Sequence, residues 1–470
     1  EGLTEEMAAN RAAYLLHKER LTSYRNRVYL PTAARAEQRL AERIYRLQNS
    51  SKPHHYGDLA EDILELEKKL RLTLNEEQKL AVTTAMTAPI SIITGGPGTG
   101  KTLIQRAFLE LYRSKNPSGE IMCCAPTGRA ARRMEESTGV SATTIHKALG
   151  LIAGEDGNYC EPEQLEADLI LVDEVSMMDI YLAGHLLYSI PQGSQLVLIG
   201  DVDQLPSVGP GAVLKSLIDC GKIPVVRLEK VYRQALGSRI ATNAKLIRSG
   251  NLGLEYGEDF QLFESSDLVE SANLLEEIYL QEAGHYGVDN VTLLTPFRQK
   301  TDTGVNALNS RLQSKVNPPE AGKPELSHGK RIFRLGDKVM QVKNFEDVNN
   351  GDVGYITGIS RDGDTSYVTV DFGDGRTMEY ESGDLEMLDH AYASTVHKSQ
   401  GSEYQSVIIN LQCAHAVMLV RPLLYTAVTR AKKRVILVGE RRAVCIAIKR
   451  VDTEQRETML AERVSELYGH

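Results

Sequence analysis

One run of eight residues has the composition of a phosphate-binding loop. It consists of Gly95, Gly96, Pro97, Gly98, Thr99, Gly100, Lys101 and Thr102, directly after the apolar segment 90–94. The run matches G-x-x-x-x-G-K-[ST] in the strand–loop–helix context that this pattern requires. The glycines let backbone N–H groups and the next helix N-terminus face phosphates. Lys101 would reach the β- and γ-phosphates, and Thr102 would help to hold Mg²⁺. We therefore predict a nucleoside triphosphate site, rather than a glycine-rich turn without a ligand.

Polar residues follow two further apolar runs. Asp173 and Glu174 come after residues 169–172, where a fold of this kind places its second magnesium ligand, here Asp173. Glu174 would orient and deprotonate the attacking water, which is the general-base task of a hydrolase. Gln204 follows the run 195–199 at the same expected sheet edge and is a candidate sensor of the γ-phosphate. Carboxylates at strand ends and polar turns are common in proteins. These roles are therefore predicted only because the same chain also has the glycine-rich loop.

Length and composition bound the class of protein. A chain of 470 residues is too long for one core and predicts two to four domains. No apolar run approaches the ~18 residues of a membrane span and no leader opens the chain, so we expect no membrane contact and a cytoplasmic location. Six cysteines without metal-like spacing indicate reduced residues. The net charge of −9 argues against a uniformly basic nucleic-acid coat but allows a basic groove.

The elements that must position these residues alternate between strands and helices. Residues 4–70 have a charged helical pattern that Pro31 and Pro53 interrupt. Strands are expected at 90–94, 121–125, 169–172 and 196–199, and again at 225–228, 291–294, 407–411 and 435–438, which is enough for a second sheet. Helices between strands imply parallel sheets. Residues 331–388 instead carry hairpin turns at 350–351, 362–363 and 374–375 and predict a small β-barrel, while 149–166 is a candidate hairpin.

Taken in order, these segments resemble the motif series of superfamily 1 DNA helicases, and within them the RecD-like branch. The segments are similar to the Q motif at 74–78, motif Ia at 125–131, motif Ib at 143–147, motif II at 173–177, motif III at 200–206, motif IV at 231–234, motif V at 395–403 and motif VI at 424–431. Segments 28–31 and 308–319 look RecD-like too. The resemblance covers residues 74 to about 439.

The resemblance implies an α/β fold with two RecA-like P-loop motor domains with parallel sheets, a small SH3-like β-barrel insertion and a helical N-terminal region. The helical region would span 1–73 and the first motor domain 74–226, with the hairpin insertion at 149–166. The second motor domain would comprise 227–330 and 389–470, and the barrel 331–388. Because the chain starts with Glu1 and family members often have a further N-terminal domain, the helical region is a candidate for truncation.

The resemblance also implies roles around ATP, which with Mg²⁺ is the expected cofactor. Gln78 would read the adenine edge and Tyr232 would stack on adenine, and Gly401 and Glu403 belong to the same ATP set. Arg233 would contact the γ-phosphate and Arg430 would act as an arginine finger. These two arginines join Lys101, Asp173, Glu174 and Gln204 as the expected catalytic residues. Since the arginines lie in the second motor domain, closure of the cleft would be coupled to hydrolysis.

The DNA side of the resemblance includes motifs Ia, Ib and V. The candidate DNA contacts are Thr127, Arg129, Thr144, His146, Phe297, Thr395 and His397, with further charge from Arg132, Arg133, Lys147 and Lys398. Contacts to phosphates suit an enzyme that ignores base sequence. The chain has no Trp, so stacking on bases would fall to aromatics such as Phe297 or Tyr392, for which the alternative is a plain core position.

The expected function is therefore that of an ATP-dependent DNA helicase that moves 5′ to 3′ on single-stranded DNA and unwinds duplexes in repair or recombination. Its expected partners are single-stranded DNA and single-strand/duplex junctions, and the polarity rests on the resemblance alone. Two alternatives stay open. The chain could be a P-loop ATPase switch, or the motor subunit of an exodeoxyribonuclease complex without nuclease activity of its own. Protein partners, such as a single-strand-binding protein or nuclease subunits, are left open.

Overall fold

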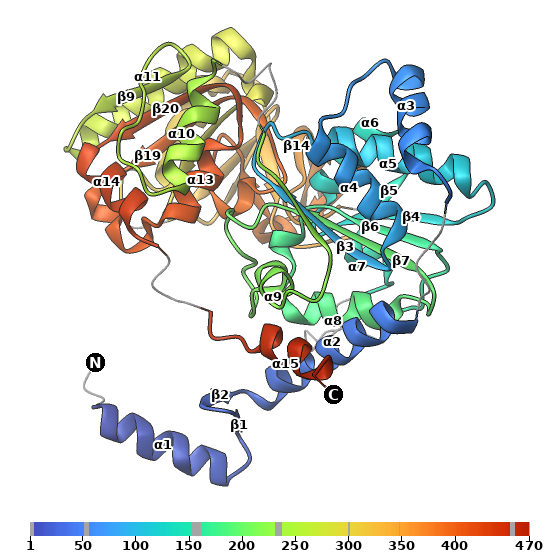
Figure 1. The fold of residues 1–470 in the computed structure, drawn as a ribbon. Coiled ribbons are helices and arrows are strands. Elements are labelled where there is room, and N and C mark those ends of the chain that lie inside the picture. The colour runs from blue at the N-terminus through green and yellow to red at the C-terminus, as the bar shows by residue number, and fades with distance from the viewer. Residues whose placement is uncertain are drawn as a thin grey trace.

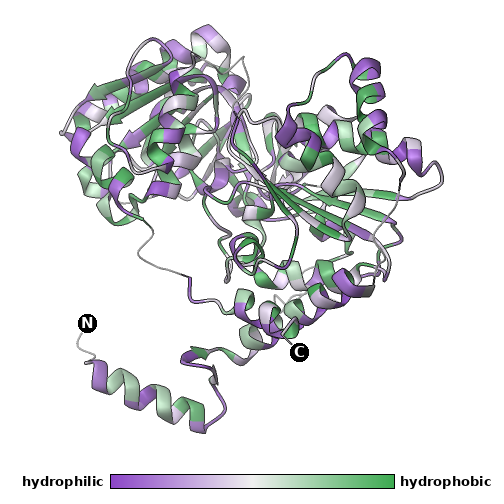
Figure 2. Cartoon of the chain, in the orientation of Figure 1, coloured by the Kyte–Doolittle hydropathy of each residue, from purple (hydrophilic) through white to green (hydrophobic). Residues whose placement is uncertain are grey.

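A computed structural model describes residues 4–50, 56–151, 161–230, 237–298, 301–346, 348–451 and 456–469. Two parallel sheets lie side by side, each covered by helices, and a β-barrel inserted into the second half lies between them (Figure 1). The strands of both sheets are apolar, whereas the helices carry mixed faces (Figure 2). Within the described ranges, no helix is both long and apolar enough to cross a membrane.

The first sheet has six strands in the order β5-β4-β6-β7-β3-β8, with every neighbouring pair parallel. The strands are β3 (Ile90–Gly95), β4 (Ile121–Ala125), β5 (Ala142–Thr144), β6 (Leu169–Val172), β7 (Gln195–Gly200) and β8 (Val225–Leu228). The run at 225–228 was grouped with the second sheet from its sequence texture. It instead pairs with β3 at the edge of the first sheet, because hydrogen-bond partners are a tertiary property that an apolar run does not encode.

Two apolar clusters cover the two faces of this sheet. On one face pack α2 (Pro31–Ser50), α8 (Ile180–Ser189), α9 (Val213–Asp219) and α15 (Leu460–Leu467). On the other pack α3 (Leu59–Leu70), α4 (Glu76–Thr87) and α5 (Lys101–Lys115). The second motor domain was predicted to extend to residue 470. However, α15 packs against α2 and α9, with Arg463 paired to the buried Glu37, so the end of the chain lies with the first sheet.

The second sheet has the order β18-β10-β19-β20-β9 and is also parallel throughout. Its strands are β9 (Phe260–Glu264), β10 (Val291–Thr295), β18 (Ala393–Thr395), β19 (Tyr404–Leu411) and β20 (Ala431–Gly439). One face packs against α10 (Arg239–Arg248), α13 (Arg421–Val428) and α14 (Arg441–Lys449), and the other against α11 (Leu268–Tyr286) and α12 (Val305–Val316). Parallel order with helices on both faces is the doubly wound arrangement that the sequence predicted.

The insertion is an antiparallel sheet of order β16-β15-β14-β13-β17. Its strands are β13 (Lys338–Gln341), β14 (Val353–Asp362), β15 (Thr365–Asp371), β16 (Thr377–Glu381) and β17 (Leu388–His390), and the hairpin β11 (Glu325–His328) and β12 (Arg331–Arg334) precedes it. The three predicted turns connect β13 to β14, β14 to β15 and β15 to β16, where Gly351, Gly363 and Gly375 have φ of +95°, +58° and +74°. Such left-handed backbone favours glycine.

The N-terminal region begins with α1 (Glu5–His17), of which no residue is buried, and continues through a short hairpin of β1 (Thr22–Tyr24) and β2 (Arg27–Tyr29) into α2. Half of the hairpin predicted at 149–166, residues 152–160, lies outside the described residues.

Candidate active site and nucleic-acid interface

The predicted phosphate-binding loop joins β3 to α5, as its pattern requires. Gly98 and Gly100 have φ of +73° and +87°, a conformation that turns backbone N–H groups inward and that other residues adopt only with strain. The ammonium of Lys101 donates to the carbonyl oxygens of Gly95 at 2.5 Å and Gly96 at 3.1 Å, so it lies inside the loop's curve. This geometry is that of a phosphate cradle with a central cation.

Gly96 also marks where the second motor domain meets the loop. A Cβ at this position would lie 2.8 Å from the hydroxyl oxygen of Tyr425 on α13. A Cβ at Gly95 would lie equally close to Leu228 of β8. Both glycines are therefore required by close packing, and at Gly96 the neighbour belongs to the other domain.

Gln78 has an observed structural role. Its Nε2 donates to the carbonyl of Thr99 at 3.0 Å, and its Oε1 accepts from the backbone N–H of Asn75 in the capping box that starts α4. The side chain is fully buried. Gln78 thus holds the phosphate loop against α4, and its reading of adenine stays a prediction.

The acidic pair lies at the end of β6. Glu174 has a φ of +52°, which is uncommon for a residue with a side chain and is the kind of local strain found at functional sites. Burial and the neighbouring Glu174 carboxylate raise the pKa of Asp173. A cation would relieve both effects. The exposed Thr102 hydroxyl and the Asp173 carboxylate are hard oxygen ligands, which fit Mg²⁺ held mainly by phosphate and water oxygens.

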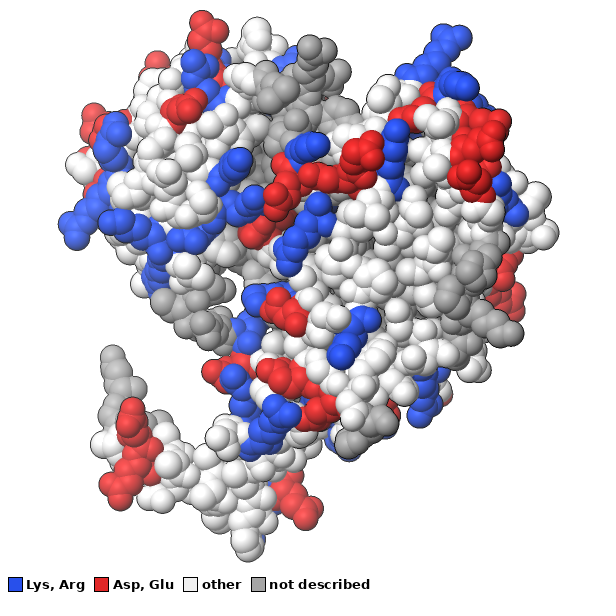
Figure 3. All heavy atoms as spheres, viewed as in Figure 1, with Lys and Arg blue, Asp and Glu red and all other residues white. Residues whose placement is uncertain are grey.

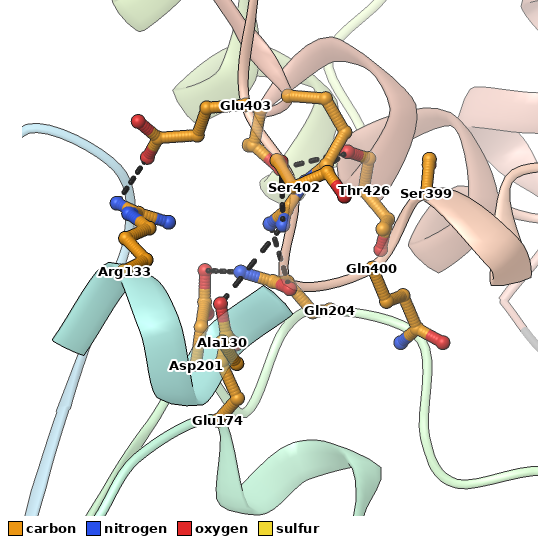
Figure 4. Close-up of polar contacts among 12 residues, drawn as sticks. Ala130, Arg133, Glu174, Asp201, Gln204, Ser399, Gln400, Ser402, Glu403 and Thr426 are labelled. Atoms are coloured by element: carbon orange, nitrogen blue, oxygen red, sulfur yellow. Dashed lines mark hydrogen bonds and ion pairs between the residues drawn. The ribbon is translucent and has the colours of Figure 1, made fainter. Parts of the chain in front are cut away.

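Arg430 joins the two motor domains at this site. Its guanidinium is almost fully buried and donates to Oε1 of Gln204 at 2.9 Å, and its Nη1 lies 3.9 Å from Oε1 of Glu174. Backbone carbonyls of Ser402 and Thr426, both at 3.3 Å, fix the same guanidinium from its own domain. Figure 4 shows Glu174 and Gln204 extending from the first domain toward the second. The predicted sensor and arginine finger are therefore in direct contact.

Further contacts across this interface were not predicted individually. The hydroxyl of Tyr425 donates to Asp201 at 2.9 Å, and the backbone N–H of Leu205 donates to the Thr426 hydroxyl at 2.8 Å. Gln400 donates to the carbonyl of Leu205 at 3.0 Å. These residues lie within the segments similar to motifs III, V and VI, so the motifs gave the signal, but the pairing required the structure.

Four residues assigned to the ATP site are not placed at the phosphate loop by the described structure, and their ATP roles stay predictions. Tyr232 and Arg233 lie outside the described residues. Glu403 forms ion pairs with Arg133 and, at 3.2 Å, with Lys432, neither of which belongs to the phosphate loop. Gly401 has a φ of +73° and faces Thr127 of the predicted DNA motif, 3.0 Å from where a Cβ would lie. Gly401 and Glu403 therefore serve the contact between the domains.

A groove of about 1150 Å³ gathers most of the residues predicted to contact DNA. Its lining includes Thr127, Arg129, Thr144, His146, Thr395, His397 and Lys398, from both motor domains, together with Asn344, Asn349 and Asn350 of the β-barrel insertion. Among the described residues of this lining, Lys and Arg are represented only by Arg129 and Lys398. The outer face drawn in Figure 3 likewise intersperses acidic and basic side chains. The groove thus favours hydrogen bonds over a dense positive field.

Three threonines of the groove each cap a backbone turn. Thr127 accepts from the N–H of Ala130 at the start of α6 (Gly128–Thr138), and Thr144 accepts from Lys147 at the start of α7 (Ile145–Ala148). Thr395 accepts from the N–H of Lys398 at 3.4 Å. A hydroxyl that accepts in this way keeps its proton to donate. The three threonines can therefore donate to phosphate oxygens while they cap.

The groove histidines are shifted toward their neutral forms. Burial lowers the pKa of His146 and of His397, to which the charge of Arg456 adds for His397. Burial also lowers the pKa of the adjacent His185. At neutral pH these imidazoles offer hydrogen bonds rather than charge.

Several predicted contacts are directed elsewhere. Phe297 does not line the groove, and its ring packs edge-on against His415 at 5.2 Å. Arg132 pairs with the buried Asp352 of the β-barrel at 2.6 Å. Arg129 borders the groove but donates to the hydroxyls of Ser402 and Tyr404. The arginines of α6 thus hold the domains together, while Tyr392 is a core residue.

Comparisons with known proteins decide the family. Residues 78–210 match a model described as an AAA domain, 308–372 the ATP-dependent RecD-like DNA helicase SH3 domain, and 390–438 the UvrD-like helicase C-terminal domain. The RecBCD enzyme subunit RecD of Mycobacterium tuberculosis is 30% identical over 477 residues, covering 90% of this chain and 78% of that protein. Its counterpart in Mycolicibacterium smegmatis is 31% identical, covering 80% and 73%. The chain belongs to the RecD-like helicase family.

The predicted family and fold class are thereby confirmed. The ATP-dependent RecD2 DNA helicase of Deinococcus radiodurans is 37% identical over 441 residues, covering 93% of this RecD-like chain but 58% of that protein. The match to a solved structure of Bacteroides Pif1 bound to ssDNA covers 78% of this chain and 92% of that chain, with a TM-score of 0.47 and 19% identity.

Proposed function

We propose that this RecD-like chain is an ATP-dependent DNA helicase that uses Mg²⁺ and moves 5′ to 3′ along single-stranded DNA. The observation that carries the proposal is the contact of Arg430 in one motor domain with Gln204 and Glu174 in the other. An ATPase that works without domain motion has no need to assemble its site from two domains. The polarity follows from family resemblance, and the junction with duplex DNA is the expected place of work.

The chemistry divides between the two domains. Lys101 and the loop N–H groups hold the β- and γ-phosphates, while bound Mg²⁺ would neutralise phosphate charge between Thr102 and Asp173. Glu174 takes the proton of the attacking water, and Gln204 orients that water or the γ-phosphate. Arg430 stabilises the charge that develops in the transition state, to which an arginine across a cleft can contribute ~10³ or more in rate. Hydrolysis would loosen the contact and let the domains separate.

The groove supplies the coupling to DNA. Both motor domains contribute hydroxyl groups to it, so opening and closing of the nucleotide cleft would change the spacing of Thr127 and Thr395 along a bound strand. Segment 200–206 connects the two sites, since Gln204 contacts Arg430 while Ser207, three residues later, lines the groove. Contacts to the phosphate backbone would allow movement on any base sequence.

The test combines hydrolysis and strand displacement. Lys101→Ala and Glu174→Gln should each abolish ATP hydrolysis stimulated by single-stranded DNA while leaving the circular dichroism spectrum unchanged. Normal turnover by either variant would refute the site. Displacement by the wild-type chain should require a 5′ single-stranded tail, and preference for a 3′ tail would overturn the polarity.

A second candidate is a motor subunit of a larger nuclease complex, which two relatives named as RecBCD subunits favour. It predicts weak unwinding by the isolated chain despite strong DNA-stimulated hydrolysis. A P-loop switch predicts hydrolysis that single-stranded DNA does not stimulate, so an ATPase titration separates the switch from both motor candidates. The strand-displacement assay then separates the motor subunit from the autonomous helicase.

A further inference from the structure

A second groove, of about 750 Å³, runs along α2 and α8. Its basic and aromatic lining consists of Arg35, Arg39, Arg43, Arg46, Tyr181, His185 and Tyr188. Helices α2 and α8 lie side by side beneath the first sheet (Figure 1) and share an apolar cluster. The groove floor is therefore formed by two helices that pack against each other, and its side chains are not part of the ATP site.

This second groove is continuous with the groove that gathers the predicted DNA contacts. Thr32, Tyr181 and His185 line both. The hydroxyl oxygens of Thr32 and Tyr181 lie 3.5 Å apart at the boundary. A strand that leaves the first groove on this side would pass directly over α2.

The arginines of α2 divide into a structural one and a group facing solvent. Arg43 donates to the backbone carbonyls of Leu187 and Ile190 on the α8 side. Arg39 and Arg46 are exposed, and neither forms an ion pair with another described residue. Arg35 uses its Nε to contact the carbonyl of Pro31 at 3.2 Å.

The spacing of the exposed arginines suits a linear polyanion. Arg35, Arg39 and Arg46 are four and seven residues apart, so they share one helix face over about 16 Å at ~1.5 Å per residue. Two carboxylates, Glu42 and Glu161, also line the groove, and Glu42 accepts from Gln38 at 3.1 Å. Four arginines against two glutamates leave the lining positive.

Tyrosines accompany these cations. Tyr188 is 61% exposed and Tyr181 is 37% exposed, which is unusual for aromatic side chains on an apolar helix. Exposed rings beside a track of cations are the arrangement that binds single strands without sequence preference, since every base offers a face for stacking.

We propose that this groove is a second binding site for single-stranded DNA, in which Arg39 and Arg46 contact phosphates and Tyr188 stacks on a base. It rests on the proposed function, because the strand arrives from the first groove. The site lengthens the DNA footprint of the chain and holds the strand next to residues 161–162, which belong to the predicted hairpin insertion at 149–166.

The experiment measures the affinity of oligothymidylates of increasing length by fluorescence anisotropy, at several salt concentrations. For wild type, affinity should rise with length until the strand fills both grooves. Arg39→Gln/Arg46→Gln should bind short oligomers within twofold of wild type and long ones ~10-fold more weakly. A plot of the logarithm of the association constant against the logarithm of salt concentration has a negative slope. For long oligomers only, this slope should become less steep by about 1.4, as loss of two single-strand phosphate contacts predicts. Tyr188→Ala should weaken the binding of long oligomers without changing the slope of the salt dependence.

A matched control is Lys68→Gln/Arg71→Gln, which removes two exposed cations from the α3 region on the opposite face of the first sheet. This control variant should bind short and long oligomers with the affinity of wild type. Equal affinity of wild type and Arg39→Gln/Arg46→Gln for long oligomers would overturn the second site. A loss of affinity by this variant for blunt duplex alone would overturn it too. Failure of wild type to bind even short oligomers would instead refute the proposed function.

Discussion

The substitution Arg430→Lys tests most directly whether hydrolysis depends on contact between the motor domains. Lysine keeps the positive charge, but it lacks the planar fork that lets arginine donate to Gln204 at 2.9 Å and to the Ser402 and Thr426 carbonyls together. The three N–H donors of an ammonium all leave one nitrogen, so they cannot reach the acceptors that Nε, Nη1 and Nη2 of Arg430 contact separately. The substitution therefore removes positioning and keeps charge.

We expect kcat for DNA-stimulated hydrolysis to fall by about 10³, equivalent to ~4 kcal/mol of transition-state stabilisation. KM for ATP should stay within about threefold of wild type, because Lys101 and the loop glycines bind the ground state. Lost hydrogen bonds to a charged group should also cost roughly 1.5–3 kcal/mol of unfolding free energy. Steady-state kinetics and chemical denaturation would measure the two effects separately.

Arg434→Lys is the matched control. Arg434 lies four residues later and pairs with Glu282 and Gln261, each at 3.0 Å, wholly inside the second motor domain. Its substitution should cost similar stability but leave kcat within about threefold. If Arg430→Lys retained more than a tenth of the wild-type kcat, or if Arg434→Lys lost as much, the cross-domain role of Arg430 would be wrong.

Three further predictions follow from buried groups. Glu174→Gln should keep ATP binding, measured with a fluorescent analogue, while single-turnover hydrolysis disappears, and residual single-turnover cleavage near the wild-type rate would exclude Glu174 as the base. Because burial lowers the folded-state pKa of His146 and His397, the unfolded chain takes up more protons below its histidine pKa of about 6.5. The free energy of unfolding should therefore fall as pH drops through about 6.5. It should fall more steeply in wild type than in a variant with both histidines replaced by asparagine. Equal slopes of unfolding free energy against pH in the two proteins would contradict this explanation. Asp352→Asn should lower the free energy of unfolding by about 3 kcal/mol, since it leaves Arg132 and Arg376 without their buried carboxylate. A change below about 1 kcal/mol in urea titration would show that these ion pairs contribute little to stability.

Local patterns predicted the local structure well. The phosphate loop was predictable because glycines at fixed spacing permit the backbone that Gly98 and Gly100 adopt, and because an apolar run and a helix flank it. The acidic pair after β6 and the hairpin turns of the insertion follow the same logic. In each case the residues that decide the conformation are neighbours in the chain.

Partners of long side chains were less predictable. Arg129 and Arg132 have the charge to contact phosphates, yet in the structure one donates to the hydroxyls of Ser402 and Tyr404 and the other to Asp352. Glu403 pairs with Arg133 of the first motor domain, a partner that its motif did not indicate, and its ATP role stays a prediction. The charge of a side chain does not determine its partner where helix α6, the insertion and β19 lie close together.

The sequence by itself predicted a nucleoside triphosphate site and membership of the RecD-like helicase family, because the order and content of its motifs are properties of the chain. Only the tertiary structure decided that β8 completes the first sheet, that α15 returns to α2, and that Arg430 contacts Gln204 226 residues away. Strand neighbours and cross-domain contacts depend on how whole surfaces pack. That packing is a collective result of many weak interactions, which a single segment of sequence does not encode.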